Sequence, residues 1–377
     1  MEQRQLHDSL ERAMTAILTP AYLRNIDRDG LYPYEAYQAW VELGLTGCGI
    51  PEQYGGSGGG VLDLARISEQ LGYWSYDVST AYTVALFTGL TVLRCGREEQ
   101  KAELLPRLVD GGIRLSVCIS EPGAGSDVSA IQTRAVRSGA GWLLNGQKLW
   151  ASGAGARDNL MLVYARTDAQ APAREGISAF LVANDQPGVT CRRLDMVGRR
   201  ATGIHEIFFD DVRIDPSRLL GEANRGWDYL LSGLQCERAL TAAGYIGAAQ
   251  RVVDLATAYA KERRQFGKPI GQFQAIAHML ADLQTEVEAG RLLAQQAASR
   301  LDRGMDSLRQ VSMAKLFGSE TYVKAANQGM QIMGAIGYSM EHEMQRHYRD
   351  ARSTTIGAGS SQMQRNIIAA CMGLAPG

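Results

Sequence analysis

The spacing of apolar residues changes twice along the chain, and these changes limit the folds that it can adopt. Residues 2 to 112 carry Leu, Ala, Glu and Arg at helical spacing, interrupted by a glycine-rich stretch at 54–60. From about residue 113 short apolar runs alternate with turns, which is typical of strands. Helical spacing returns after Gly226. The sequence therefore predicts a mostly helical fold in three parts: an N-terminal helical domain (1–112), a middle β domain (113–222) and a C-terminal helical domain (223–377).

Individual elements follow from the same spacing. Strand-like runs cover 142–144, 159–165, 176–182 and 203–209. Long helical stretches cover roughly 227–262, 273–303, 307–333 and 343–372. Four helices of this length are expected to pack as a bundle.

Charge and cysteine usage exclude several classes of protein. Thirty-nine Lys and Arg against forty Asp and Glu leave a net charge of -1, so no overall attraction to nucleic acid or an anionic membrane is expected. The six cysteines are scattered singly, which favours reduced thiols in a cytoplasm. The five histidines lack metal-ligand spacing, so no metal site is expected. No signal core precedes the domain, and no run is expected to reach the roughly 18 to 20 apolar residues of a membrane span.

A loop with the composition of a ligand site opens the β domain. Cys118-Ile-Ser-Glu-Pro-Gly-Ala-Gly-Ser-Asp127 combines glycines, which let a ligand approach the backbone, with hydroxyls that bind polar edges. As composition alone it is equally a tight turn. Farther on, Arg263-Arg-Gln-Phe-Gly offers guanidinium groups suited to pyrophosphate, or simply a solvated helix end.

One carboxylate lies among small residues on a predicted helix. Within 230–244, positions 233, 237, 241 and 244 share a face as Gly, Glu, Thr and Gly. Small side chains leave room for another molecule beside Glu237. The alternative is an ordinary Glu-Arg pair with Arg238 on a solvated helix surface.

Segments in order from Gly49-Ile-Pro-Glu-Gln-Tyr-Gly-Gly56 to Arg365 resemble the flavin-dependent acyl-CoA dehydrogenases. The match covers all but the first few dozen residues. It implies FAD, the fold of that family with a middle β-barrel and a C-terminal four-helix bundle, and a homo-oligomer, by family habit a tetramer. Within Tyr348–Gln362, however, Ala358 stands where most members carry the catalytic glutamate.

The resemblance also offers a replacement for the missing base. Isovaleryl-CoA and long-chain acyl-CoA dehydrogenases carry the base on the helix that corresponds to 230–244, which makes Glu237 the candidate. The backbone N–H of Ala358 is expected to bind the thioester carbonyl together with a ribityl hydroxyl of FAD. Gly357 replaces a family aromatic residue and is expected to open the acyl pocket, and Arg238 and Ser126 are expected near coenzyme A.

The cofactor contacts implied by the resemblance fall into three groups. The ring side of FAD is assigned to Val117, Cys118, Ile119, Ser120, Ser126, Trp150, Ala151 and Ser152. The pyrophosphate side, reached from the partner subunit, is assigned to Arg263, Gln265, Phe266, Phe273, Gln274, Gln331, Gly334 and Ala335, and the adenosine end to Ser360 and Gln362. Ser120 and Ser152 replace family threonines and keep the hydroxyl, whereas Ala335 replaces a glycine and is expected to weaken FAD binding slightly.

The leading hypothesis is an oxidation of an acyl-CoA to the trans-2-enoyl-CoA. Glu237 removes the α-proton, a hydride passes to flavin N5, and an electron-transfer flavoprotein accepts the electrons. Three alternatives remain open: a substrate tethered to an acyl carrier protein, an enoyl-thioester reductase, and a flavin-binding protein without catalysis. The sequence does not determine the acyl chain.

Overall fold

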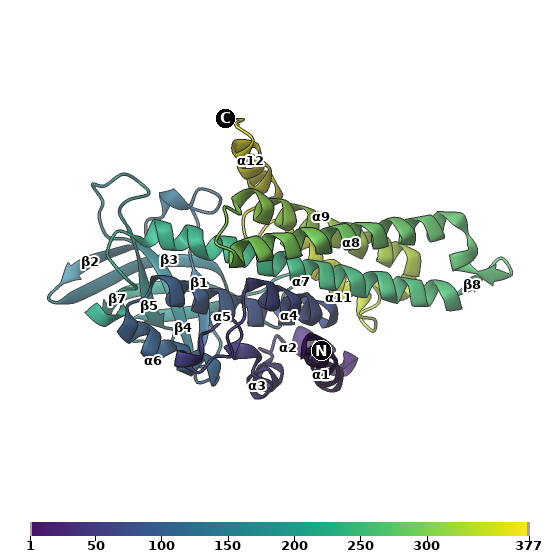
Figure 1. Cartoon of the computed structure of the whole chain (residues 1–377), viewed down its shortest axis with the longest axis horizontal. Helices are drawn as coiled ribbons and strands as arrows, with labels where there is room; N and C mark the ends of the chain where they lie inside the picture. Colours follow the sequence, from purple (N-terminus) through teal and green to yellow (C-terminus); the bar gives the residue numbers. More distant parts are fainter. Residues whose placement is uncertain (1, 375–377) are drawn as a thin grey trace.

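The computed structural model describes residues 2–374 and divides them into the three expected parts (Figure 1). The first part is helical throughout. Its helices are α1 (Glu2–Ile17), α2 (Pro20–Asp29), α3 (Tyr34–Glu42), α4 (Val61–Trp74), α5 (Tyr76–Cys95) and α6 (Glu98–Val109). The predicted fold class is confirmed.

Local signals explain where these helices begin and end. The hydroxyl of Thr19 accepts a hydrogen bond from the Tyr22 amide at 3.2 Å, and Pro20 occupies the first turn of α2. Gly30 ends α2 in the left-handed conformation, with φ of 65°. The glycine-rich stretch 54–60 is a surface turn before α4.

Helix α5 departs from one expectation. It is long and apolar enough to cross a membrane by length and composition, although the sequence predicted no such run. Its most apolar window is 83% buried inside the protein. The burial accounts for the composition, because α5 packs against α4, α6, α7 and β1 and has no solvated face along most of its length.

The middle part is a curled seven-stranded sheet. Its strands are β1 (Arg114–Cys118), β2 (Arg134–Ser138), β3 (Gly141–Ser152), β4 (Asn159–Arg166), β5 (Ile177–Ala183), β6 (Val189–Leu194) and β7 (Ile204–Ile214). The strand order is β1-β4-β2-β3-β7-β6, with β5 also paired to β4. All four predicted strand-like runs are strands. The strands β1, β2 and β6 escaped prediction because they are short, and β2 and β6 are largely exposed.

The C-terminal part begins with α7 (Gly226–Glu262), which runs from the sheet to the small hairpin of β8 (Arg264–Gln265) and β9 (Lys268–Pro269) (Figure 1). Helices α8 (Gln274–Asp302) and α9 (Leu308–Met333) pack against it. The fourth predicted helix, 343–372, is wrong as a single element. It is two helices, α11 (Met344–Thr354) and α12 (Ser361–Cys371), which follow the short α10 (Ala335–Tyr338).

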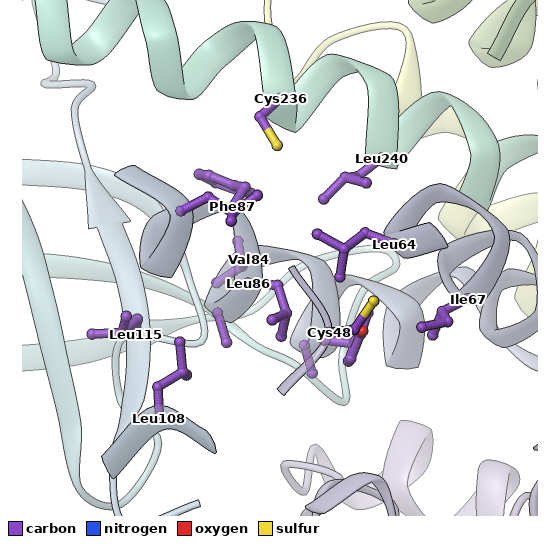
Figure 2. Packing of buried hydrophobic residues seen from close by; sticks show 14 of the residues in the cluster. Cys48, Leu64, Ile67, Val84, Leu86, Phe87, Leu108, Leu115, Cys236 and Leu240 are labelled. Carbon is purple, nitrogen blue, oxygen red and sulfur yellow. The ribbon is translucent and has the colours of Figure 1, made fainter. Parts of the chain in front are cut away.

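One core joins the first part to the last. Figure 2 shows Cys236 and Leu240 of α7 above Phe87 and Val84 of α5, with Leu64 of α4 beside them. Glycines allow the helices to approach closely. A Cβ atom on Gly72 of α4 would lie 2.2 Å from the backbone oxygen of Gly244 in α7. This packing fixes α7 against α4 and α5.

Candidate active site

Two separate segments of the β domain are tied together by a buried lysine. Lys148 Nζ donates to the backbone oxygen of Ile119 at 2.9 Å and to Glu121 Oε1 at 2.7 Å. The Leu149 amide donates to the oxygen of Ser120 at 2.8 Å. The glycine-rich loop after β1 therefore lies against the end of β3. Sequence reasoning paired these two segments only through the family resemblance.

A bulge in β3 presents an aromatic ring at this edge. The pairing of β3 with β7 shifts register between Lys148 and Ala151, and Trp150 takes a left-handed φ of 67°. Its indole is 54% exposed. The neighbouring Ser152 is partly exposed, so a hydroxyl lies next to an open aromatic surface.

The expected ring-binding residues divide by orientation. The side chains of Cys118 and Ala151 are buried in the core of the sheet, so only their backbones can meet a ligand. Partly or fully exposed side chains remain at Val117, Ile119, Ser120 and Ser126.

On α7, Glu237 is half-buried, and its carboxylate has no hydrogen bond or ion pair within residues 2–374. Gly233, one turn earlier, faces Thr91 of α5. Burial raises the pKa of Glu237 above its ordinary value. The cations of Arg238, Lys315 and Arg199 act in the opposite direction with a smaller effect. A carboxyl of this kind is suited to proton transfer near neutral pH.

Lys315 of α9 fixes the turn between α11 and α12. It is fully buried, and its Nζ donates to the backbone oxygens of Thr354 at 2.9 Å and Gly359 at 2.7 Å. Burial lowers the pKa of Lys315 to about 8. A Cβ atom on Gly359 would lie 3.7 Å from Nη2 of Arg238, so the turn reaches the residue next to Glu237.

The turn presents Ala358 in an unusual conformation. Ala358 has a left-handed φ of 53°, and its oxygen accepts from Gln364 Nε2 at 3.2 Å. Its N–H donates to no other group in the described part of the chain. Next to it, a Cβ atom on Gly357 would meet only the oxygen of Ser353, at 3.8 Å. The turn thus offers a free amide and open space.

A second group of predicted residues surrounds a cavity of about 500 Å³ at the other end of α7. Its lining includes Arg263, Gln265, Phe266, Phe273, Gly334 and Ala335. Phe266 is 94% exposed on the β8–β9 hairpin. Glu262 lies 25 residues after Glu237 on α7, a rise of about 37 Å, so this cavity and Glu237 lie far apart along the helix.

Four predicted residues belong neither to the group at the sheet edge nor to the lining of the cavity. Gln274 and Gln331 are exposed and do not line the cavity. Ser360 caps α12 through its hydroxyl, which accepts from the Met363 amide at 3.3 Å, and Gln362 is exposed on the first turn of that helix.

The residues at the sheet edge fit a flat ring with polar edges. An exposed indole on a strained bulge is costly unless a ligand covers it. Hydroxyls of Ser126 and Ser152 and the glycine backbone supply polar contacts. At the distant cavity, Arg263 and Gln265 supply donors for phosphate. Within residues 2–374 no group of three His, Cys, Asp or Glu side chains could hold a metal ion.

Three charged residues near the site were missed from the sequence. Lys148 and Lys315 are fully buried, and Arg199 donates from Nη2 to Ser152 Oγ at 3.0 Å. Charged residues ordinarily lie in solvent, and nothing in the spacing of these three indicated that they are buried or bonded inside the protein.

Family models cover nearly the whole chain. The N-terminal, middle and C-terminal domain models of acyl-CoA dehydrogenase match residues 1–112, 116–212 and 224–373. The chain belongs to the acyl-CoA dehydrogenase family. It is accordingly an oxidoreductase, and the resemblance drawn from its motifs is confirmed.

Curated relatives share this length and organisation. A probable acyl-CoA dehydrogenase of Bacillus subtilis is 36% identical, covering 98% of this chain and 97% of that protein. The mitochondrial isovaleryl-CoA dehydrogenase of Pongo abelii is 34% identical, covering 97% and 88%. Acryloyl-CoA reductase (NADH) of Anaerotignum propionicum is 32% identical, covering 97% and 93%.

Solved structures agree with this acyl-CoA dehydrogenase fold. A glutaryl-coenzyme A dehydrogenase in complex with glutaryl-CoA superposes with a TM-score of 0.94 at 35% identity, covering 99% of this chain and 95% of that one. The prolyl acyl carrier protein oxidase AnaB also gives 0.94, at 28% identity, covering 99% of each chain. The family therefore includes neighbours with different acyl carriers.

Proposed function

We propose that the protein is an FAD-dependent acyl-CoA dehydrogenase in which Glu237 is the catalytic base. The observation that carries this proposal is the carboxylate of Glu237. It is half-buried, has a raised pKa and makes no ion pair within residues 2–374, and the neighbouring Arg238 reaches the turn that carries Ala358. A structural glutamate in such a place would ordinarily be paired.

Different residues have different roles in removing a proton from the carbon next to a thioester. The free N–H of Ala358 donates to the thioester oxygen and stabilises the negative charge that develops there. Glu237 takes the α-proton, and burial by substrate raises its proton affinity further. FAD, when bound at the edge formed by Ser120, Trp150 and Ser152, would accept the hydride from the β-carbon. Lys315 keeps the Ala358 amide in position.

The distance along α7 supports an oligomer. Arg263 and the cavity around it lie about 37 Å from Glu237 along the helix, beyond the reach of one FAD held at the sheet edge. The cavity is therefore proposed to hold the pyrophosphate side of an FAD bound by a second copy. This arrangement supports a homo-oligomer, by the family pattern a tetramer.

The test is anaerobic reduction of the bound flavin. Flavin-loaded protein is mixed with short, branched and long acyl-CoAs, and bleaching of the visible flavin band is followed. We expect bleaching by wild type and a loss of about 10³-fold or more in rate for Glu237→Gln. Glu103→Gln, at an exposed ion pair with Arg218 on the surface of α6, is the matched control and is expected to bleach normally. Equal rates for Glu237→Gln and wild type would remove Glu237 as the base.

The carrier of the acyl group is a separate question. The likeness to AnaB supports a carrier-protein thioester as the second candidate, and the likeness to acryloyl-CoA reductase supports the reverse reaction. Bleaching by an acyl carrier protein thioester but by no acyl-CoA would favour the first. Reoxidation of reduced flavin by an enoyl-CoA, faster than its reduction by the saturated thioester, would favour the second. An electron-transfer flavoprotein is the proposed acceptor for the dehydrogenase.

A further inference from the structure

Arg199 lies in a turn that is clamped from both sides. The turn joins β6 to β7, and Arg199 has a left-handed φ of 58°. Its amide donates to Asp350 Oδ1 of α11 at 2.6 Å. Asp77 of α5 accepts from the amide of Ala201 at 2.6 Å. Two buried carboxylates thus fix the backbone and determine where the Arg199 side chain points.

The guanidinium of Arg199 has donors to spare. Nη2 donates to Ser152 Oγ at 3.0 Å, and the group lies 5.5 Å from the centre of the Tyr76 ring. Nε is buried and has no hydrogen-bond partner, and no carboxylate within residues 2–374 forms an ion pair with the group. An arginine with unused buried donors is costly unless a ligand uses its charge or its donors.

Asp77 lies close enough to Arg199 for the two charges to interact, but the structure shows no ion pair between them. Both clamping carboxylates use oxygens on backbone amides rather than on the guanidinium. Burial and the charge of Asp77 raise the pKa of Asp350 to about 7, so it is only partly ionised at neutral pH. Glu237 is close enough for Arg199 to lower its pKa, without an ion pair between them. No carboxylate binds the guanidinium directly, so its free donors and its charge are available to a ligand beside Ser152.

We propose that Arg199 stabilises the negative charge that the flavin ring gains on two-electron reduction. The proposal rests on the proposed function, because Ser152 borders the ring only if FAD binds at this edge. A hydride adds two electrons and one proton, so the ring becomes more negative by one charge. A fixed cation nearby favours the reduced form and raises the midpoint potential. If Arg199 only locks the turn, the potential will not depend on its charge.

The test is a spectroelectrochemical titration of flavin-loaded protein without any thioester. Arg199→Met is expected to lower the ratio of reduced to oxidised flavin at a fixed potential at least tenfold, equivalent to about 30 mV for a two-electron couple. Arg199→Gln keeps a donor for Ser152 without the charge and is expected to behave like Arg199→Met. Arg199→Lys is expected to retain most of the wild-type potential. Arg137→Met, at a cation packed on Trp142 where β3 begins, is the control and should leave the potential unchanged.

Two results would overturn the proposal. One is a wild-type potential in both Arg199→Met and Arg199→Gln. The other is a loss in Arg199→Met that Arg199→Gln restores, which would assign the effect to the hydrogen bond with Ser152. The outcome is independent of the substrate. If no thioester bleaches the flavin but the potential shifts as expected, the dehydrogenase assignment fails and the role of Arg199 stands.

Discussion

The Nζ atom of Lys315 donates a hydrogen bond of 2.7 Å to the backbone oxygen of Gly359, so that a buried cation of α9 holds the turn that carries Ala358. The same ammonium also binds the oxygen of Thr354, where α11 ends. In this way α9 connects the end of one helix, the proposed carbonyl-binding amide and the face of α7 that carries Glu237. Catalysis and local stability are therefore expected to depend on the same lysine.

Replacing Lys315 should destabilise the protein. Lys315→Met leaves two backbone oxygens without their charged donor, and we expect the free energy of unfolding to fall by about 2 to 4 kcal/mol. Urea unfolding of both proteins gives this difference. Lys324→Met, on the same helix but in a half-exposed pair with Glu286, should cost at most about 1 kcal/mol. An equal decrease in the free energy of unfolding in the two variants would show that the hydrogen bonds of Lys315 stabilise the protein no more than a surface ion pair does.

The size of the side chain at position 357 should limit the size of the acyl group that the pocket accepts. The space beside it is open and its backbone conformation suits any residue, so Gly357→Tyr should fold normally and fill that space. We expect kcat/KM for a branched or long acyl-CoA to fall about tenfold or more, with less than about a threefold change for a short one. The measurement compares the steady-state rates of wild type and Gly357→Tyr, with Gly357→Ala as the control. A uniform loss for every thioester would place the acyl chain elsewhere.

The sequence offered a candidate base for this region but did not predict its geometry. The small residues around Glu237 were expected to leave room for a ligand, but Gly233 faces Thr91 and Gly244 approaches Gly72, so they serve helix packing. Glu237 stays the candidate base, and Ala358 the altered position, through the family motif. The break at 355–360 was missed although Gly357 and Gly359 are helix-breaking signals, because the helical spacing on either side hid them. The buried Lys148 and Lys315 and the partly buried Arg199 could not be predicted, because a charged residue becomes buried only through partners distant in sequence.

His205 should make the fold sensitive to acid. Burial lowers the pKa of this histidine from 6.5 to about 4. Between these pH values the imidazole is protonated in the unfolded chain but not in the folded protein. Stability is full above pH 6.5 and falls as the pH decreases toward 4, by up to about 3 kcal/mol. Urea unfolding at pH 7 and pH 4.5 should show a smaller loss for His205→Gln than for wild type. An identical pH dependence in both would contradict this assignment.

A carboxylate moved to the turn should replace the one on α7. In Glu237→Gln/Ala358→Glu the new side chain starts from the turn that lies next to Arg238, and Ala358 already adopts the left-handed φ there, so the substitution adds little backbone strain. We expect flavin reduction by acyl-CoA to recover at least about tenfold over Glu237→Gln alone. Stopped-flow reduction rates measure the recovery. If flavin is still bound but no activity is recovered, the turn does not bring a carboxylate within reach of the reacting carbon.

The most direct test of Glu237 isolates proton removal from hydride transfer. Protein whose flavin is already reduced is incubated with a saturated acyl-CoA in deuterium oxide, and deuterium at the α-carbon is followed by mass spectrometry. The wild type and Glu103→Gln should exchange the α-proton, whereas Glu237→Gln should exchange it about 10³-fold more slowly or not at all. Exchange by Glu237→Gln at the wild-type rate would show that another group is the base.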